Sequence, residues 1–418
     1  IVFVHHSSVQ FCSSGVTGTI AARSGGFGFS LLPVMLPKWC QVSTVATVQF
    51  ASDRALMSFV LLDDARAGSD TPARLFRDPQ DVIVATAPDE VRPAFERMRA
   101  ELGRGRHLAG YMSYEAGLAL EDRLAPLARA TTMPLLWFGV FATMERLSDA
   151  GRAAFLGDPE TAWAGRPRPR ISRAAYVAAV DRLLDYIAAG DIYQANFTFR
   201  ADVPVAGPPR ALYARLRAAG GGGWGGVIDD GRNWLLSCSP ELFFTLDDGR
   251  LTARPMKGTA DAATDPAVLR ADAKQRAENL MIVDLLRNDL SRVASPGSVA
   301  VPPLFEIETY PTVHQMTSTA TATLAPGRDA IDVLATIFPC GSVTGAPKIR
   351  AMEVIAELES DERGPYTGAI GYLSPDGNAA FNVAIRTLVI PEGSGSAIMG
   401  LGSGVVADST SGAEWREC

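Results

Sequence analysis

FPCGSVTGAPKIRAM, residues 338–352, joins a loop rich in glycine and hydroxyl groups to the expected start of a helix. Pro347 suits the first turn of a helix, where its missing N–H is not needed, so we expect a helix to follow it. Backbone amides and hydroxyls in front of a helix can hold an anion. Taken by itself, the run from Gly341 to Lys348 is explained equally well as an ordinary loop.

Two more helices are marked on the N-terminal side of this stretch. Ser172 can cap a helix that ends at Gly190, because apolar residues recur between them at helical spacing. Asp265 can cap a second helix, with Pro266 in its first turn, and the pattern continues to about Val293. The sequence therefore predicts long helices on both sides of residue 200.

Short apolar runs separated by glycine turns predict strands in the rest of the chain. The predicted strands are Met57–Leu62, His107–Tyr114, Gln194–Arg200, Trp234–Cys238, Leu242–Leu246, Gly368–Leu373, Ala379–Val389 and Ala397–Leu401. Strands that alternate with turns and mix with a few helices favour an α+β fold with large antiparallel sheets.

Composition shifts suggest how the chain is divided. Residues 1–50 have almost no charge and no clear period, and we expect them to be disordered or translated from upstream. Residues 157–170 have the Pro, Gly and charge content of a linker. We therefore predict an N-terminal subdomain over residues 51–156 and a catalytic domain over residues 171–418, truncated at its C-terminus.

Charge and cysteine content exclude several classes of function. The formal net charge is −7 with a pI of about 5.3, and the charges are spread along the chain. This leaves no footprint for nucleic acid or an anionic membrane surface. The five cysteines are scattered and never form CxxC, which argues against a disulfide framework or a zinc site and favours a cytoplasmic location.

Several polar residues have ordinary explanations when each is taken alone. Glu278, Glu414 and Glu417 fit solvated helix faces, although Mg²⁺ prefers such carboxylate oxygens. His314 fits a structural histidine between apolar neighbours. Lys257 fits an exposed lysine, although a lysine held in a closed site can act as a nucleophile once deprotonated.

The order of seven motifs changes this interpretation. Together they resemble the chorismate-utilising enzymes, a family that includes anthranilate, aminodeoxychorismate, isochorismate and salicylate synthases; the resemblance covers about residues 57–418. The motifs are SPELFF (239–244), PMKGT (255–259), AENLMIVDLLRNDLSRV (277–293), FPCGSVTGAPKIRAM (338–352), YTGAIGY (366–372), FNVAIRT (381–387) and GLGSGVVADS (400–409).

The resemblance implies an α/β sandwich of two large antiparallel sheets flanked by helices, with the site between them. It implies that Glu278 and Glu417, with Glu414 beside them, bind Mg²⁺, which would orient the carboxylate of chorismate. Glu241 would protonate the departing hydroxyl.

The resemblance also implies which residues would contact the substrate. His314 and Ser342 would line the substrate ring. The residues expected to hold the substrate are Tyr366, Arg386, Gly402 and Gly404, together with Gln194, Thr259 and Lys348.

Four positions, in three segments of the chain, separate the reactions of the family. Water-using members carry a lysine where this chain has Gln194, so water addition is disfavoured. Lys257, with Ser342 and Thr344, resembles aminodeoxychorismate synthase. The resemblance then implies that the Lys257 amine attacks ring C2 while the C4 hydroxyl leaves, and that ammonia next attacks C4 and expels the lysine.

The resemblance implies partners as well as a substrate. Ammonia would come from a glutamine amidotransferase subunit, and an aminodeoxychorismate lyase, fused or separate, would release 4-aminobenzoate for folate synthesis. Two alternatives stay open: an anthranilate synthase, and an inactive subunit that binds tryptophan near Leu61, Leu62 and Asp63.

Overall fold

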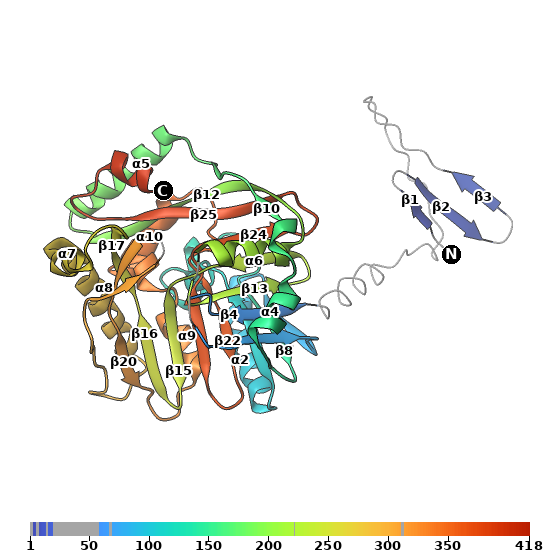
Figure 1. Cartoon of the computed structure of the whole chain (residues 1–418), viewed down its shortest axis with the longest axis horizontal. Helices are drawn as coiled ribbons and strands as arrows, with labels where there is room; N and C mark the ends of the chain where they lie inside the picture. The colour runs from blue at the N-terminus through green and yellow to red at the C-terminus, as the bar shows by residue number, and fades with distance from the viewer. Residues whose placement is uncertain are drawn as a thin grey trace. The chain divides into compact units, whose positions relative to one another are not determined.

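A computed structural model describes residues 58–66, 69–220, 222–310 and 313–418, together with the backbone of three short strands within residues 3–19. The chain divides into two compact units, Ile1–Val48 and Gln49–Cys418. Figure 1 shows the chain coloured from its N-terminus to its C-terminus.

The first unit contains a small antiparallel sheet. Its strands are β1 (Phe3–His5), β2 (Ser8–Ser13) and β3 (Val16–Thr19). The rest of the segment 1–50, expected to be disordered or translated from upstream, lies outside the described residues. That expectation stays a prediction.

Two large sheets dominate the second unit, and neighbouring strands in both are antiparallel. The first has the order β10 (Trp163–Ala164), β12 (Gln194–Ala206), β25 (Ser396–Val405), β24 (Thr387–Pro391), β14 (Asn233–Ser237), β13 (Gly225–Asp229), β4 (Phe59–Asp63), β5 (Ala73–Arg77) and β9 (Glu145–Leu147), with β11 (Arg168–Pro169) and β21 (Gly345–Ala346) also paired to β12.

The second large sheet has a smaller sheet near one edge. The large sheet has the order β20 (Ala320–Thr323), β16 (Arg250–Arg254), β15 (Leu242–Asp247), β23 (Ala379–Val383), β22 (Ala369–Leu373), β7 (His107–Met112), β8 (Leu136–Phe141) and β6 (Asp81–Ala85). The small sheet has the order β17 (Met256–Asp261), β19 (Val313–Thr317) and β18 (Glu306–Thr309).

A shared core joins the two large sheets face to face. Val60 and Leu235 of the first sheet pack in one buried cluster with Tyr111 and Ile370 of the second. Helices flank the pair (Figure 1). The helices are α2 (Pro88–Gly103), α3 (Ala116–Leu120), α4 (Asp149–Leu156), α5 (Arg173–Ala188), α6 (Pro209–Gly220), α7 (Pro266–Ala271), α8 (Ala273–Ser291), α9 (Ala330–Ile337), α10 (Lys348–Leu358) and α11 (Ser411–Glu417). The α+β sandwich predicted from the sequence is confirmed.

The chain crosses the predicted linker without leaving this unit. Within residues 157–170, β10 and β11 pair with β12, and a short 3-10 turn precedes them at Pro159–Thr161. Strands from before residue 157 also complete both large sheets, since β4 pairs with β13 and β7 with β22. The boundary at 157–170 therefore runs through one compact unit, because these pairings tie its two sides together.

Local signals placed most element ends correctly, with two differences. Ser172 caps α5 by accepting from the Ala175 amide, as predicted. The helix expected from Asp265 to about Val293 is instead two helices, because Asp272 is extended and caps α8 through the Gln275 amide. The strand expected over Ala379–Val389 is also divided. Within the described residues, no helix is long and apolar enough to cross a membrane.

Candidate active site

Lys257 lies where β17, β12 and β25 approach one another. β12 and β25 pair with Asn196 opposite Gly404. A Cβ added to Gly404 would stand 2.6 Å from Lys257 Nζ, 3.0 Å from Asn196 Oδ1 and 3.2 Å from Gln194 Nε2. Because Gly404 has no side chain, the Lys257 amine has room to approach the side-chain amides of Asn196 and Gln194.

Carboxylates from two helices surround the same amine. Glu278 Oε2 of α8 is 3.6 Å from Lys257 Nζ. Glu414 of α11 is buried, and its Oε2 has no hydrogen-bond partner among the described residues. The pKa of Glu417 is raised by burial and by the nearby charges of Glu414 and Glu278, against the opposite effect of Lys257. The three predicted metal ligands are therefore close enough to feel one another's charge.

This donor set suits a hard divalent cation. Mg²⁺ takes carboxylate oxygens, usually one or two from the protein, and leaves other positions to water and an anionic substrate. The unpartnered oxygen of Glu414 and the raised pKa of Glu417 both indicate negative charge that lacks compensation. In the part of the chain that the structure describes, no three acidic, histidine or cysteine side chains form a ready-made cluster. The residues fit Mg²⁺ shared with a substrate better than a closed all-protein site.

Glu241 lies close enough to Lys257 to be affected by the charge of the lysine, and it is 3% exposed. Burial raises its pKa to about 7, although hydrogen bonds from Ser342 and the Met256 amide and the charge of Lys257 act in the opposite direction. Ser342 Oγ donates to Glu241 Oε1 at 2.6 Å, and the Cys340 thiol is 3.2 Å from the same hydroxyl. A carboxyl group with this pKa can donate a proton near neutral pH.

Two more buried polar groups near these strands lack partners. His314 is 4% exposed; its Nδ1 is 2.9 Å from Thr309 Oγ1, and its Nε2 has no partner among the described residues. Gln194 is fully buried, and its Oε1 likewise has none in that part of the chain. Because buried polar atoms are normally hydrogen-bonded, such groups are typical of a site that receives a polar ligand.

The residues expected to hold the rest of the substrate are more dispersed. A Cβ on Gly400 would overlap the Tyr366 ring, so this tyrosine packs directly against β25. Arg386 has a φ of 51° and divides β23 from β24; its side chain is exposed and makes no hydrogen bond or ion pair with the described residues. Gly402 pairs with Thr198 in the same ladder as Gly404. Thr259 is exposed and accepts from Gln315 Nε2 at 2.9 Å.

Lys348 has another partner. Its ammonium donates to Asp289 Oδ2 at 2.5 Å and to the Ile337 carbonyl at 2.7 Å. Asp289 is 4% exposed on α8, and burial raises its pKa while Lys348 lowers it. An ammonium beside a buried carboxylate stays with it, because separation would leave a buried charge unpaired. Lys348 therefore joins α10 to α8 in this structure, and its predicted contact with the substrate stays a prediction.

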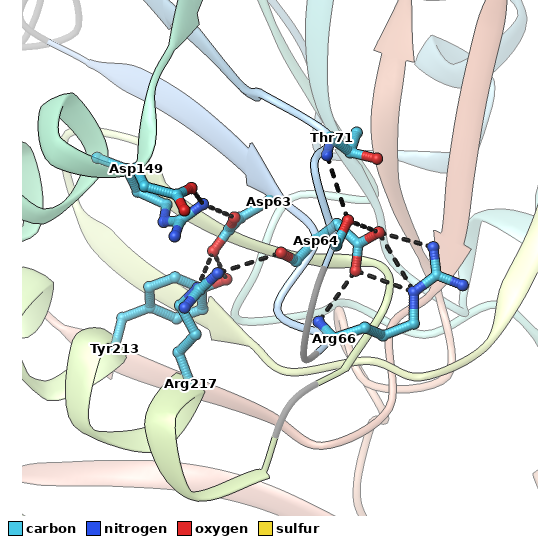
Figure 2. Close-up of polar contacts among 9 residues, drawn as sticks. Asp63, Asp64, Arg66, Thr71, Asp149, Tyr213 and Arg217 are labelled. Atoms are coloured by element: carbon cyan, nitrogen blue, oxygen red, sulfur yellow. Dashed lines mark hydrogen bonds and ion pairs between the residues drawn. The ribbon is translucent and has the colours of Figure 1, made fainter. Parts of the chain in front are cut away.

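The residues proposed for tryptophan lie elsewhere, on β4. Leu61 and Asp63 point to the helix side of the strand: Leu61 packs in the core there, and Asp63 pairs with Arg217 of α6 and with Arg152 of α4 at 3.3 Å. Figure 2 shows Asp63 held by Arg217 and Tyr213, beside Asp64 and its partner Arg66.

A cavity of about 480 Å³ lies along the same strand. Its lining includes Leu62, Arg66 and Tyr372, and none of the residues described above around Lys257. Leu62 and Asp63 of the predicted trio both line this cavity, although the carboxylate of Asp63 already has two guanidinium partners.

Sequence reasoning missed some groups of this site. Asn196 follows Gln194 by two residues on β12, and residues two apart in a strand face the same side, so the spacing itself pointed to Asn196. The position of the Cys340 thiol near Glu241 had no comparable signal, because the segments that hold these two residues meet only in the folded chain.

Comparisons with known proteins agree with this fold. The family described as chorismate binding enzyme matches residues 57–418, and the chain belongs to that family. The crystal structure of anthranilate synthase component I from Streptococcus pneumoniae has a TM-score of 0.71 and 26% identity, covering 84% of this chain and 91% of that chain.

Curated relatives at similar identity carry names for different reactions of chorismate, including a 2-amino-4-deoxychorismate synthase of Streptomyces globisporus that is 40% identical over 244 residues, 57% of this chain and 49% of that protein. Aminodeoxychorismate synthase component 1 of Klebsiella aerogenes is 42% identical over 257 residues, 60% of this chain and 56% of that protein. Anthranilate synthase component 1 of Streptomyces coelicolor is 41% identical over 255 residues, 59% of this chain and 50% of that protein. This chain thus spans about half the length of these relatives. Anthranilate synthase component 1 of Thermus thermophilus is 36% identical over 372 residues, with 79% and 80% covered.

Proposed function

We propose that this chain is the chorismate-converting component of an aminodeoxychorismate synthase. It replaces the C4 hydroxyl of chorismate with an amino group derived from ammonia and gives 4-amino-4-deoxychorismate. The observation that carries the proposal is the position of Lys257. Its amine lies in the space beside Gly404 of β25, and its Nζ is 3.6 Å from Glu278 Oε2. A lysine at this position can attack the substrate as a nucleophile. A reaction in which ammonia attacks the ring directly would not need such a lysine.

The chemistry divides one difficult displacement into two. In its uncharged form the Lys257 amine forms a bond to ring C2, the two conjugated double bonds of the ring shift, and the C4–O bond breaks. Glu241 gives the departing hydroxyl its proton, so that water leaves. Ammonia then forms a bond to C4, the two double bonds shift back, and the C2–N bond breaks to return lysine; the new amine loses its extra proton to Glu241.

Mg²⁺ would be held by Glu278 and Glu417, with Glu414 beside them. When bound, it would neutralise carboxylates of the substrate and hold the ring in place. The protein groups do the remaining work: the unpartnered atoms of Gln194 and His314 offer hydrogen bonds to substrate or ammonia, and exposed Arg386 offers a guanidinium for a carboxylate.

The proposed pathway involves other proteins. A separate glutamine amidotransferase supplies ammonia, a fused or separate lyase releases 4-aminobenzoate for folate synthesis, and the reactions take place in the cytoplasm. The printed names of several relatives include "component 1", which supports a multi-component enzyme.

Anthranilate synthase is a second candidate, because relatives with that name reach the same identity as the aminodeoxychorismate synthases. That reaction expels pyruvate. A subunit that binds tryptophan without turnover is a third, supported by the cavity beside Leu62.

One experiment separates these candidates. The purified chain is incubated with chorismate, Mg²⁺ and an ammonium salt, and the products are resolved by chromatography and mass spectrometry. The proposal expects 4-amino-4-deoxychorismate with its enolpyruvyl group intact and no pyruvate. Fluorescent anthranilate with equal pyruvate would replace the proposal by the second candidate, and a 2-amino product would assign direct attack at C2.

A further inference from the structure

Arg363 is the centre of a buried network beside the candidate active site. The residue is 4% exposed. A guanidinium has five N–H donors, and here Nε and Nη2 bind the Glu359 carboxylate at 2.8 and 2.7 Å. The remaining donors reach the Asn196 carbonyl at 2.7 Å, the Val343 carbonyl at 2.9 Å and Thr367 Oγ1 at 3.4 Å. Each donor group of the side chain is therefore used.

The carbonyls that accept hydrogen bonds from Arg363 belong to two separate segments beside the candidate site. Asn196 belongs to β12, where its own side chain and that of Gln194 face Lys257. Val343 follows Ser342, the residue that donates to Glu241. The Arg363 guanidinium thus links β12, which lies next to Lys257, to the turn that contains Ser342, which contacts Glu241.

Glu359 reinforces the same link. Its Oε1 also accepts from the Thr198 amide of β12 at 2.7 Å. Two residues further along β12, Arg200 pairs with Glu362 at 3.3 Å, so the segment 359–363 is fastened to β12 at successive positions. On its other side, the Arg363 amide donates to Glu115 Oε1 at 2.5 Å.

The buried pair is better explained by geometry than by stability. Burial opposes the charge of Arg363, but the Glu359 carboxylate together with Tyr114 and Tyr366 outweighs this effect, so the pKa of Arg363 is raised. Buried ion pairs are often no more stabilising than apolar residues of equal size, but a guanidinium fork fixes the positions of its acceptors.

We propose that Arg363, oriented by Glu359, is a positioning residue that holds the Ser342–Thr344 turn in place against β12, in addition to the direct hydrogen bond from the Asn196 amide to the Thr344 carbonyl at 2.8 Å. It acts through the backbone and reaches no reacting atom. The proposal deepens the proposed function and rests on it, since it explains how the groups around Lys257 and Glu241 keep the alignment that two successive displacements need.

The test is Arg363→Lys, which keeps a positive charge but cannot supply the planar fork. Arg123→Gln is the control, because Arg123 also pairs with a glutamate but is 65% exposed. With wild-type turnover established, we expect Arg363→Lys to lower kcat about 100-fold, since small misplacements of catalytic groups have effects of that order. The KM for chorismate should stay within about threefold, and the control should match wild type. A kcat within twofold of wild type in folded Arg363→Lys would overturn the proposal.

Hydrogen exchange gives a readout that does not depend on turnover. In Arg363→Lys, amides in residues 193–200 and 341–347 should exchange faster, while those of β5 and β6 should not change. If Arg363→Lys does not fold, Glu359→Gln is used, which keeps a similar shape and removes the charge. Wild type that converts no chorismate would refute the proposed function alone. Unchanged exchange in both segments of a folded variant would refute the positioning role alone.

Discussion

Ser342 donates its hydroxyl hydrogen to Glu241 across 2.6 Å, although 101 positions separate the two residues in the sequence. The bond stabilises the carboxylate and so lowers its pKa, against the larger effect of burial, which raises the pKa to about 7. These opposing effects leave Glu241 able to hold and release a proton near neutrality.

The pH dependence of turnover follows from this pair. An acid must be protonated to act, so kcat should fall as the pH rises through about 7. Ser342→Ala removes a hydrogen bond to the carboxylate, raises the pKa of Glu241 and should move this fall to higher pH. Glu241→Gln should lower kcat on the order of 10²- to 10⁴-fold. Exposed Ser291 on α8 supplies the control Ser291→Ala. A profile that Ser342→Ala leaves unmoved would remove Glu241 from the role of acid.

Replacing Lys257 tests whether this residue acts as a nucleophile or only balances charge. Lys257→Ala should bind Mg²⁺ and chorismate nearly as wild type does, while turnover falls on the order of 10⁴-fold or more, as in other losses of a covalent nucleophile. Lys257→Arg should be equally inactive, because a guanidinium remains protonated. Mass spectrometry of wild type quenched with chorismate and no ammonia should find an adduct on the peptide containing Lys257. Full activity of Lys257→Arg is incompatible with covalent catalysis.

Mg²⁺ and chorismate should bind with mutual dependence. Glu278 and Glu417 come from separate helices and need the substrate to complete the metal shell, so each ligand should raise the affinity for the other by the same factor. Calorimetric titration of Glu278→Gln should show weaker binding of both. Asp284→Asn is a matched control, because Asp284 is on the same helix but is 78% exposed. If neither Mg²⁺ nor Glu278→Gln changes the affinity for chorismate, the ligand assignment is wrong.

Local sequence patterns predicted elements well and long-range partners poorly. The cap at Ser172 and the helix after Pro347 depend on neighbouring residues, and both are present. The break at Asp272 was missed because a capping aspartate within an apolar period resembles an ordinary helical residue. The contact between Lys348 and Asp289 could not be predicted, because the two residues are 59 positions apart in the sequence. The Lys257 amine meets the side chains of Gln194 and Asn196 at Gly404 because β12 and β25 pair in the register that sets Asn196 opposite Gly404.

The chain by itself should use ammonium and not glutamine. Glutamine hydrolysis requires a reactive thiolate, and burial raises the pKa of Cys238 and of Cys340 to about 12 in each case. Cys418 also has its pKa raised by burial. Turnover with ammonium chloride should therefore proceed, whereas glutamine should support it only after a separate amidotransferase is added. Glutamine-dependent turnover by the single purified chain, free of contaminating glutaminase, contradicts the assignment.

Gly404 should be essential to activity and nearly neutral for stability. A Cβ at this position would stand 2.6 Å from Lys257 Nζ, and its other near neighbours are the side-chain ends of Asn196 and Gln194. Flexible side-chain ends can move aside, so Gly404→Ala should fold, and its unfolding temperature should stay close to that of wild type. The displaced lysine should then lower kcat by about 100-fold.

Gly395→Ala is the matched control, since a Cβ there would meet nothing closer than the Val205 carbonyl at 3.9 Å. Measured side by side, Gly395→Ala should keep wild-type turnover, and Gly404→Ala should lose both turnover and the Lys257 adduct. This joint loss is the informative result, because a general loss of folding would also lower the unfolding temperature, whereas displacement of one amine does not. Wild-type turnover by Gly404→Ala would mean that the lysine amine does not act from the gap in which the structure places it.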